Sequence, residues 1–88
     1  MTEQDSSLIS THDRFTVFYT LEWKDEAVYT TRDFADLFKL EFRDVRYHLM
    51  RMVDDGLLCR VKYEGNTWYM KRCNYDDFKK LRPYIHLL

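Results

Sequence analysis

The sequence predicts one domain that is mainly α-helical and carries a small β-hairpin, and three observations support this fold class. Of the 88 residues, 45% are hydrophobic and 17% are aromatic, with only two glycines and one proline, a composition that favours regular structure over disorder. Large apolar residues recur at helical spacing up to residue 56, and two runs of alternating character follow around Gly65. Residues 1–10 are mostly polar and predict a flexible tail, so residues 11–88 form the single domain.

Two elements are predicted before residue 31. Residues 12–23 predict the first helix, because Phe15, Phe18 and Tyr19 follow the i, i+3, i+4 spacing of one amphipathic stripe. Residues 27–31 combine β-branched and aromatic side chains, which predicts a short strand.

Residues 31–38 predict a second, short helix that Thr30 or Thr31 caps at its start. Asp33 lies near the exposed amide groups of the first turn, where a negative charge is favourable. The inner face of this helix contains Phe34, Leu37 and Phe38. A turn of three residues, 39–41, then leads into the next helix.

Residues 42–55 predict a third helix with one apolar and one polar side. At about 100° per residue, the inner stripe contains Val45, His48, Leu49 and Met52, flanked by Phe42 and Val53. The opposite side carries Arg43, Arg46, Tyr47 and Met50, with Arg51 and Asp54 at its margins. Gly56 suits a left-handed C-cap, beyond which Leu57 returns to the core. We interpret His48 as a packed histidine that is hydrogen-bonded within the core.

Residues 57–72 predict a β-hairpin whose loop is Gly65-Asn66, with the positive φ of a type II′ turn at the glycine. This turn brings apolar residues of the two strands opposite each other, Tyr63 with Trp68 and Val61 with Met70. We interpret them as hairpin core. The other face of the hairpin carries one tyrosine and the basic residues Arg60, Lys62 and Lys71.

The C-terminal segment predicts a final helix. Asn74 can cap it, Phe78 and Leu81 face inward, and Pro83 interrupts or redirects it. The apolar residues near the C-terminus, Ile85, Leu87 and Leu88, are expected to pack on the first helix or to meet a second subunit.

The net charge of −1 hides an uneven distribution. Residues 1–38 contain three basic and eight acidic side chains, whereas residues 39–72 contain eight basic and five acidic ones. The positive excess therefore lies in the segment of the third helix and the hairpin, and a partner of negative charge is expected there.

The order helix, strand, helix, turn, helix, hairpin, helix resembles the winged helix-turn-helix family of DNA-binding domains. The resemblance rests on "TTRDFADLFKLEFRDVRYHL" followed by "GLL" and "TWYM". The resemblance covers residues 12–73. Within the family, this segment is similar to the very small winged helices of pilus-operon regulators and to single-domain bacterial repressors. The N-cap of the third helix departs from the pattern, since Glu41 or Phe42 stands where Ser or Thr is usual.

The resemblance implies that the third helix enters the major groove of double-stranded DNA and that the hairpin, the wing, reaches the backbone or minor groove. Arginine can bind the O6 and N7 of guanine together, and Arg43, Arg46 and Tyr47 occupy the first two turns. The remaining recognition-helix contacts are expected from Met50 and from Lys39 and Arg51, of which the two basic residues are expected to meet phosphates. The wing contacts are expected from Arg60, Lys62, Asn66 and Lys71.

Other classes of function find little support. Asp54-Asp55 and Asp76-Asp77 suit helix ends better than a two-carboxylate active site, and there is no glycine-rich phosphate loop or metal-ligand spacing. Neither enzymatic activity nor a cofactor is expected. Cys59 and Cys73 are read as packed thiols in a reducing compartment. With no long apolar run, the protein is expected to be cytoplasmic, without contact with a membrane.

The sequence thus predicts a small transcriptional regulator of prokaryotic or viral type that binds specific double-stranded DNA as a homodimer. Two alternatives stay open. The same fold can bind a protein partner, as an adaptor that modulates another regulator or a polymerase, and it can serve replication or partition.

Overall fold

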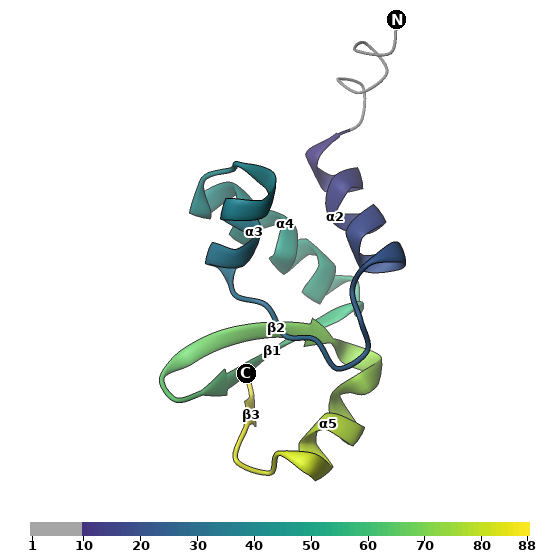
Figure 1. Ribbon diagram of the computed structural model, residues 1–88, viewed down its shortest axis with the longest axis vertical. Coiled ribbons are helices and arrows are strands. Elements are labelled where there is room, and N and C mark those ends of the chain that lie inside the picture. Colours follow the sequence, from purple (N-terminus) through teal and green to yellow (C-terminus); the bar gives the residue numbers. More distant parts are fainter. Residues whose placement is uncertain (1–9) are drawn as a thin grey trace, which may run out of the picture.

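The described part of the chain, residues 10–88 of this computed structural model, is a mixed α/β fold with four α-helices and a three-stranded antiparallel sheet. The elements are α2 (Thr11–Leu21), α3 (Thr31–Phe38), α4 (Phe42–Asp54), β1 (Leu58–Tyr63), β2 (Asn66–Lys71), the short 3-10 helix η1 (Arg72–Asn74), α5 (Tyr75–Leu81) and β3 (His86–Leu87). The sheet order is β2-β1-β3 (Figure 1).

Helix α2 begins one residue earlier than predicted. The Ser10 side chain accepts a hydrogen bond from the backbone N–H of Asp13 at 3.1 Å and caps the helix. Ser10 is therefore part of the folded domain and not of the predicted tail. The rest of that tail, residues 1–9, lies outside the described residues.

Helix α3 starts with a reciprocal capping box. The backbone N–H of Asp33 donates to the Thr30 hydroxyl at 3.2 Å, and the backbone N–H of Thr30 donates to the Asp33 carboxylate at 2.8 Å. Two of the free amide groups at the helix start are satisfied in this way. Of the two predicted caps, Thr30 is the one that forms. The helix ends at Lys39, whose φ of 59° turns the chain toward α4.

Helix α4 has a weak start and a well-defined end. Glu41 is the N-cap and makes no side-chain cap hydrogen bond. At the other end Gly56 has a φ of +83°, and the N–H groups of Gly56 and Leu57 donate to the carbonyls of Val53 and Met52, each at 3.0 Å. These two bonds form a Schellman motif, so the predicted glycine stop is confirmed.

The predicted order of strands is wrong in two places. The expected strand at residues 27–31 is reduced to an isolated bridge, in which Tyr29 and Tyr69 exchange backbone hydrogen bonds of 3.0 and 2.7 Å. It cannot extend, because the next residue, Thr30, caps α3. A third strand, β3, lies instead at the C-terminus and pairs with β1, with Val61 opposite Leu87.

The predicted hairpin register is also wrong. The loop consists of Glu64 and Gly65, both with positive φ (50° and 80°), so that Val61 lies opposite Trp68 instead of Met70. Positive φ at both central residues is the type I′ pattern, which matches the right-handed twist of the strands. The slip moves each partner by two residues, so every side chain stays on its predicted face.

Both faces of the hairpin are covered (Figure 1). Helices α2, α3 and α4 lie on one side, where Leu58 and Tyr69 join a core that includes Phe15, Phe34 and Leu49. Helix α5 lies on the other side. The second core there consists of Cys59, Val61, Met70, Phe78 and Ile85. The hairpin face expected to be basic is thus buried at its base, and the C-terminal segment packs on the hairpin rather than on α2.

The C-terminal helix forms over Tyr75–Leu81 and buries Phe78 as predicted, but Leu81, expected to face inward, is 67% exposed, and the predicted cap does not form. Asn74 is at the N-cap position and its side chain makes no cap hydrogen bond. The 3-10 turn η1 leads directly into the helix instead.

Candidate nucleic-acid interface

Helix α4 separates buried apolar residues from exposed basic ones, as the sequence predicts. Val45, Leu49 and Met52 have no exposed surface at all. Arg43, Arg46 and Tyr47 are exposed on the other side of the helix. Because the buried side fixes how the helix is rotated on its neighbours, the two arginines are held toward solvent by the packing of the core.

Two residues of α4 differ from the prediction. Phe42, expected beside the core, has 52% of its surface exposed. It is the first residue of the helix, and side chains lean toward the helix start, which carries its ring beyond the end of the core. The Arg32 guanidinium carbon lies 5.6 Å from the centre of this ring. Met50, expected in solvent, is half-buried at the edge of the core.

The exposed side of α4 is hollowed. We name this open depression of about 470 Å³ the arginine hollow. Its walls are formed by Thr31, Phe42, Arg43, Arg46, Tyr47 and Met50. It combines two guanidinium groups, two aromatic rings and the hydroxyls of Thr31 and Tyr47, with Thr31 contributed by the start of α3. The depression therefore offers charged donors and apolar contact surface side by side.

The basic groups of α4 are available to a partner. Arg43 approaches Glu41 at 3.8 Å, but their side chains are 86% and 78% exposed, and such a surface pair contributes little. Within residues 10–88, Arg46 and Arg51 form no ion pair. The Arg51 guanidinium carbon lies 6.0 Å from the centre of the Tyr47 ring.

Two further basic residues flank this helix. Lys39 is exposed in the turn between α3 and α4, where it was predicted to contact phosphate. Arg32 is exposed in the first turn of α3, and the sequence reasoning missed it. Arg32 and Phe42 are ten positions apart in the chain, so only the packing of α3 on α4 brings them together. The signal available in the sequence was a lone arginine next to a capping box, which is too common to be informative.

The hairpin places its predicted contact residues unequally. Lys62 and Asn66 are exposed near the turn, where a partner can reach them. Arg60 is half-buried and opposite Tyr69, and its Nε is buried without a hydrogen-bond partner among the described residues. The outer half of the hairpin therefore presents one lysine, one amide and, in the turn itself, the exposed carboxylate of Glu64.

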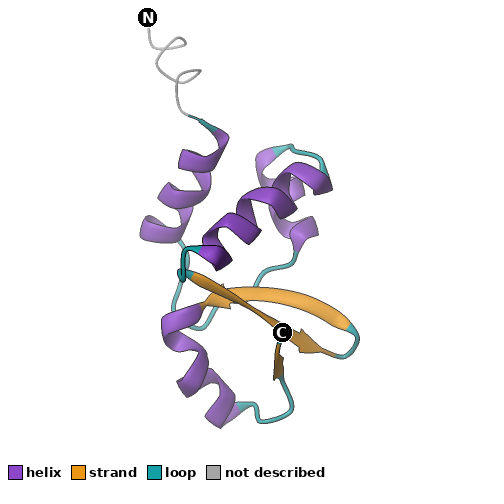
Figure 2. Cartoon of the chain, turned by 180° about the vertical axis from the view of Figure 1, so that it is seen from behind, coloured by secondary structure: helices purple, strands orange, loops and turns teal. Residues whose placement is uncertain are grey.

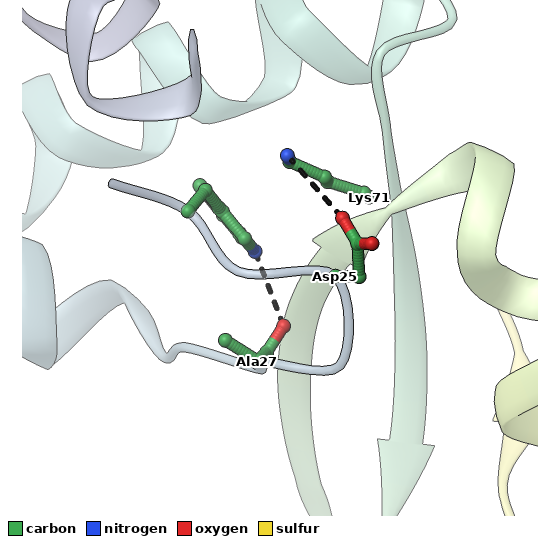
Figure 3. Close-up of polar contacts among 4 residues, drawn as sticks. Asp25, Ala27 and Lys71 are labelled. Atoms are coloured by element: carbon green, nitrogen blue, oxygen red, sulfur yellow. Dashed lines mark hydrogen bonds and ion pairs between the residues drawn. The ribbon is translucent and has the colours of Figure 1, made fainter. Parts of the chain in front are cut away.

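Lys71 does not belong with these residues. Its side chain is only 14% exposed, and its Nζ lies 3.9 Å from the Asp25 carboxylate (Figure 3) and 4.9 Å from the centre of the Tyr19 ring. The register places Lys71 opposite Leu58, at the base of the hairpin. Lys71 thus joins the hairpin to α2 and the loop that follows it.

The start of α4 and the turn of the hairpin extend toward the same side of the molecule. Both lie toward the left in Figure 1 and toward the right in Figure 2, which shows the opposite view. The exposed residues at the start of α4 and those near the hairpin turn therefore lie on the same side of the molecule.

His48 packs against α2. Its ring is stacked on Phe15 at 5.3 Å and on His12 at 5.6 Å. Desolvation, followed by the nearby His12 and Arg51, lowers the pKa of His48 below its ordinary value of 6.5, while Asp44 acts in the opposite direction. Its Nδ1 is buried and has no hydrogen-bond partner in the described part of the chain. The residue is a packed histidine, as interpreted from the sequence, although that interpretation assumed a hydrogen bond here.

The two thiols lie in different surroundings. Cys59 is buried, and desolvation raises its pKa to about 11, so it remains a neutral thiol. Cys73 is exposed. Over residues 10–88 no group of three or more His, Cys, Asp or Glu side chains is placed to hold a metal ion.

Comparisons with known protein families, with curated proteins and with solved structures each found no match to the chain. None of the helices described here combines the length and apolar character required to cross a membrane.

Proposed function

We propose that the chain is a winged helix-turn-helix domain that binds specific double-stranded DNA and regulates transcription. In this proposal α4 is the recognition helix in the major groove, and the β1–β2 hairpin is the wing on the backbone or minor groove. One observation carries it. Arg43 and Arg46 project beside an exposed Tyr47 from a helix whose opposite side carries the fully buried Val45, Leu49 and Met52.

The order of elements supports the winged-helix assignment. Helix α2, the bridge at Tyr29, α3, α4 and the hairpin follow one another along the chain. Tyr29 pairs with β2, so the bridge and β1 lie on opposite sides of that strand. The strand β3, which pairs with the free side of β1, is an addition to this pattern.

The chemistry of the exposed face supports base reading by α4. Arginine presents two donors that fit guanine, and each good contact of this kind discriminates by about 1–3 kcal/mol. Phe42 and Tyr47 supply apolar surface for a thymine methyl group. Lys39 and Arg51 are assigned to phosphates, and Arg32 is added to them because it lies beside Phe42.

The wing is assigned a smaller part than the sequence implied. Lys62 and Asn66 are its contact residues, with Arg60 in support. Lys71 is omitted, because its ammonium group already lies against Asp25 and Tyr19. No cofactor is required for any of these contacts.

A homodimer is part of the proposal. One small DNA-binding module buries only about 600–1,000 Å² on DNA, and two copies would double the contact. Val17 and Leu21 on α2 are 50% and 75% exposed, which gives a second copy apolar surface to cover. Sedimentation at tens of micromolar protein tests this, and a monomer alone would contradict it.

The principal alternative is a protein-binding adaptor that modulates another regulator or a polymerase. It is favoured by the acidic character of residues 1–38 and by the exposed Leu37 on α3 (53%). A role in replication or partition uses the same DNA contacts, and footprints on origin and promoter DNA would separate it from transcriptional regulation.

The decisive experiment selects a binding site from random duplex DNA. The affinity for this site is then measured for the unaltered protein and for two variants. Arg46→Ala is expected to weaken binding by about tenfold or more. Arg72→Ala, a matched change at an exposed arginine in η1, is expected to have little effect. Equal affinity and equal salt dependence for all three proteins would show that α4 is not the reading helix. Absence of any binding at low salt would favour the adaptor.

A further inference from the structure

A second hollow lies on the other side of the hairpin from α4, between the sheet and the C-terminal segment. We name it the sheet hollow, and its volume is about 190 Å³. Its apolar walls come from Val28, Val61, Trp68, Phe78 and Ile85. Tyr63 and Tyr84 lie at it as a ring pair with centroids 5.0 Å apart. The lining is thus almost entirely aromatic and aliphatic.

Hydrogen bonds hold the C-terminal wall of the sheet hollow in place. The Lys79 ammonium group donates to the carbonyl of Pro83 at 2.7 Å and also to that of Ile85. Strand β3 then pairs with β1, and the N–H of Leu88 donates to the carbonyl of Arg60 at 2.9 Å. These bonds within the chain fix the position of the wall, which reduces the ordering cost of binding.

Among the residues that line the sheet hollow, Arg82 is the only charged one. Its guanidinium carbon lies 4.6 Å from the centre of the Phe78 ring, another wall residue, so the cation is held against the hollow. Within residues 10–88 it forms no ion pair. An unpaired cation at the side of an apolar cavity is complementary to a ligand with an apolar body and one negative charge.

We propose that the sheet hollow binds a small aromatic carboxylate, with the ring among the apolar walls and the carboxylate on Arg82. A dry apolar cavity of about 150 Å³ accepts a benzene ring, and the larger volume here leaves room for the carboxylate. The planar guanidinium fork binds both carboxylate oxygens, which a point charge could not do.

The location of the sheet hollow gives the ligand a defined structural effect. Val61 and Trp68 are cross-strand partners in the hairpin, and Ile85 precedes β3. A ring bound among them contacts the hairpin and the C-terminal segment together, and so stabilises their packing. This inference needs neither DNA binding nor the arginine hollow, and it can fail or hold independently of the proposed function.

Benzoate is the probe, and nitrogen-15 NMR of the full chain is the measurement. The protein has two tryptophans. Benzoate is expected to shift the indole N–H signal of Trp68, with a dissociation constant on the order of 0.1 to 1 mM for a ligand of this size. The indole signal of Trp23, which is buried in the other core and donates to Ala27, is expected to stay in place.

Charge and shape are tested separately. Arg82→Gln is expected to weaken benzoate binding at least tenfold, whereas the matched change Arg72→Gln, at an arginine that also lies over an aromatic ring, is expected to leave it unchanged. Benzyl alcohol, which lacks the negative charge, is expected to bind the unaltered protein at least tenfold more weakly than benzoate. Val28→Trp fills the sheet hollow and is expected to abolish binding, with a dispersed NMR spectrum as the check on folding.

Three results would overturn the proposal. The first is an equal affinity of Arg82→Gln and the unaltered protein for benzoate. The second is a change in NMR signals on addition of benzoate that is confined to the arginines of α4, which would mean nonspecific anion binding. The third is unchanged binding by a folded Val28→Trp variant.

Discussion

His48 of α4 stacks on Phe15 of α2 with ring centroids 5.3 Å apart and ring planes inclined by 22°. This contact joins the proposed recognition helix to the helix that supports it. It also places the titratable ring of His48 against an apolar one, and the ring of His12 lies 5.6 Å from that of His48.

The first prediction follows from this stack. Desolvation lowers the pKa of His48 in the folded protein below 6.5. As the pH falls below 6.5, the unfolded chain takes up the proton first, so folding stability is greatest above that pH and decreases as the pH falls toward the folded pKa. Thermal unfolding at pH 7.5 and 5 measures the effect. His48→Gln is expected to reduce the decrease, and the matched change His86→Gln at an exposed histidine is expected to leave it intact.

The second prediction concerns the core beneath α4. Leu49 has no exposed surface, and truncation of a buried leucine to alanine costs about 2–5 kcal/mol. Leu49→Ala is therefore expected to remove a large part of the free energy of unfolding, as measured by urea titration. Leu37→Ala, at a leucine that is 53% exposed, is the control, and an equal loss in both variants would contradict the assigned orientation of the core.

The third prediction concerns the uncapped start of α4. Glu41 makes no side-chain cap hydrogen bond, and a serine at this position would satisfy a free amide group, for a gain of about 1 kcal/mol. Glu41→Ser is expected to raise the melting temperature. It also removes a carboxylate that lies 3.8 Å from Arg43, so DNA affinity is expected to rise as well. Glu41→Ala, which removes the charge without providing a cap, separates the two effects.

The fourth prediction contrasts two hairpin lysines. Lys62→Ala is expected to lower DNA affinity and to reduce the slope of log affinity against log salt by about 0.9 for each lost phosphate contact. Lys71→Ala is expected to leave that slope unchanged and to lower stability instead, since its ammonium group lies against Asp25 and Tyr19. The reverse assignment of effects would show that the hairpin is presented to DNA differently.

Helical periodicity was sufficient to predict the presence of α2, α3 and α4, but not every buried residue: Leu37, expected on the inner face of α3, is 53% exposed. The end of α4 was predicted correctly, because Gly56 is one of only two glycines in the chain. A glycine accepts the positive φ that the hydrogen bonds of the helix end need at this position. The hairpin register was not predicted, since Gly65 suits either of two overlapping turns and the type I′ turn needs Glu64 in a conformation that its residue type disfavours.

The site was predicted in the same uneven way. The exposure of Arg43, Arg46 and Tyr47 follows from rotation about one helix axis, which a sequence specifies. The contact of Arg32 with Phe42 and the withdrawal of Lys71 depend on how separate elements pack, and no local pattern contains that information.

The hairpin has one further consequence, because it is covered on both faces. The helices α2 to α4 and the C-terminal segment each bury their apolar residues against the same two strands. If those strands separate, the apolar residues of both cores become exposed to water. We therefore expect heat or urea to melt the whole molecule in one cooperative step, with near-ultraviolet and far-ultraviolet circular dichroism giving the same midpoint.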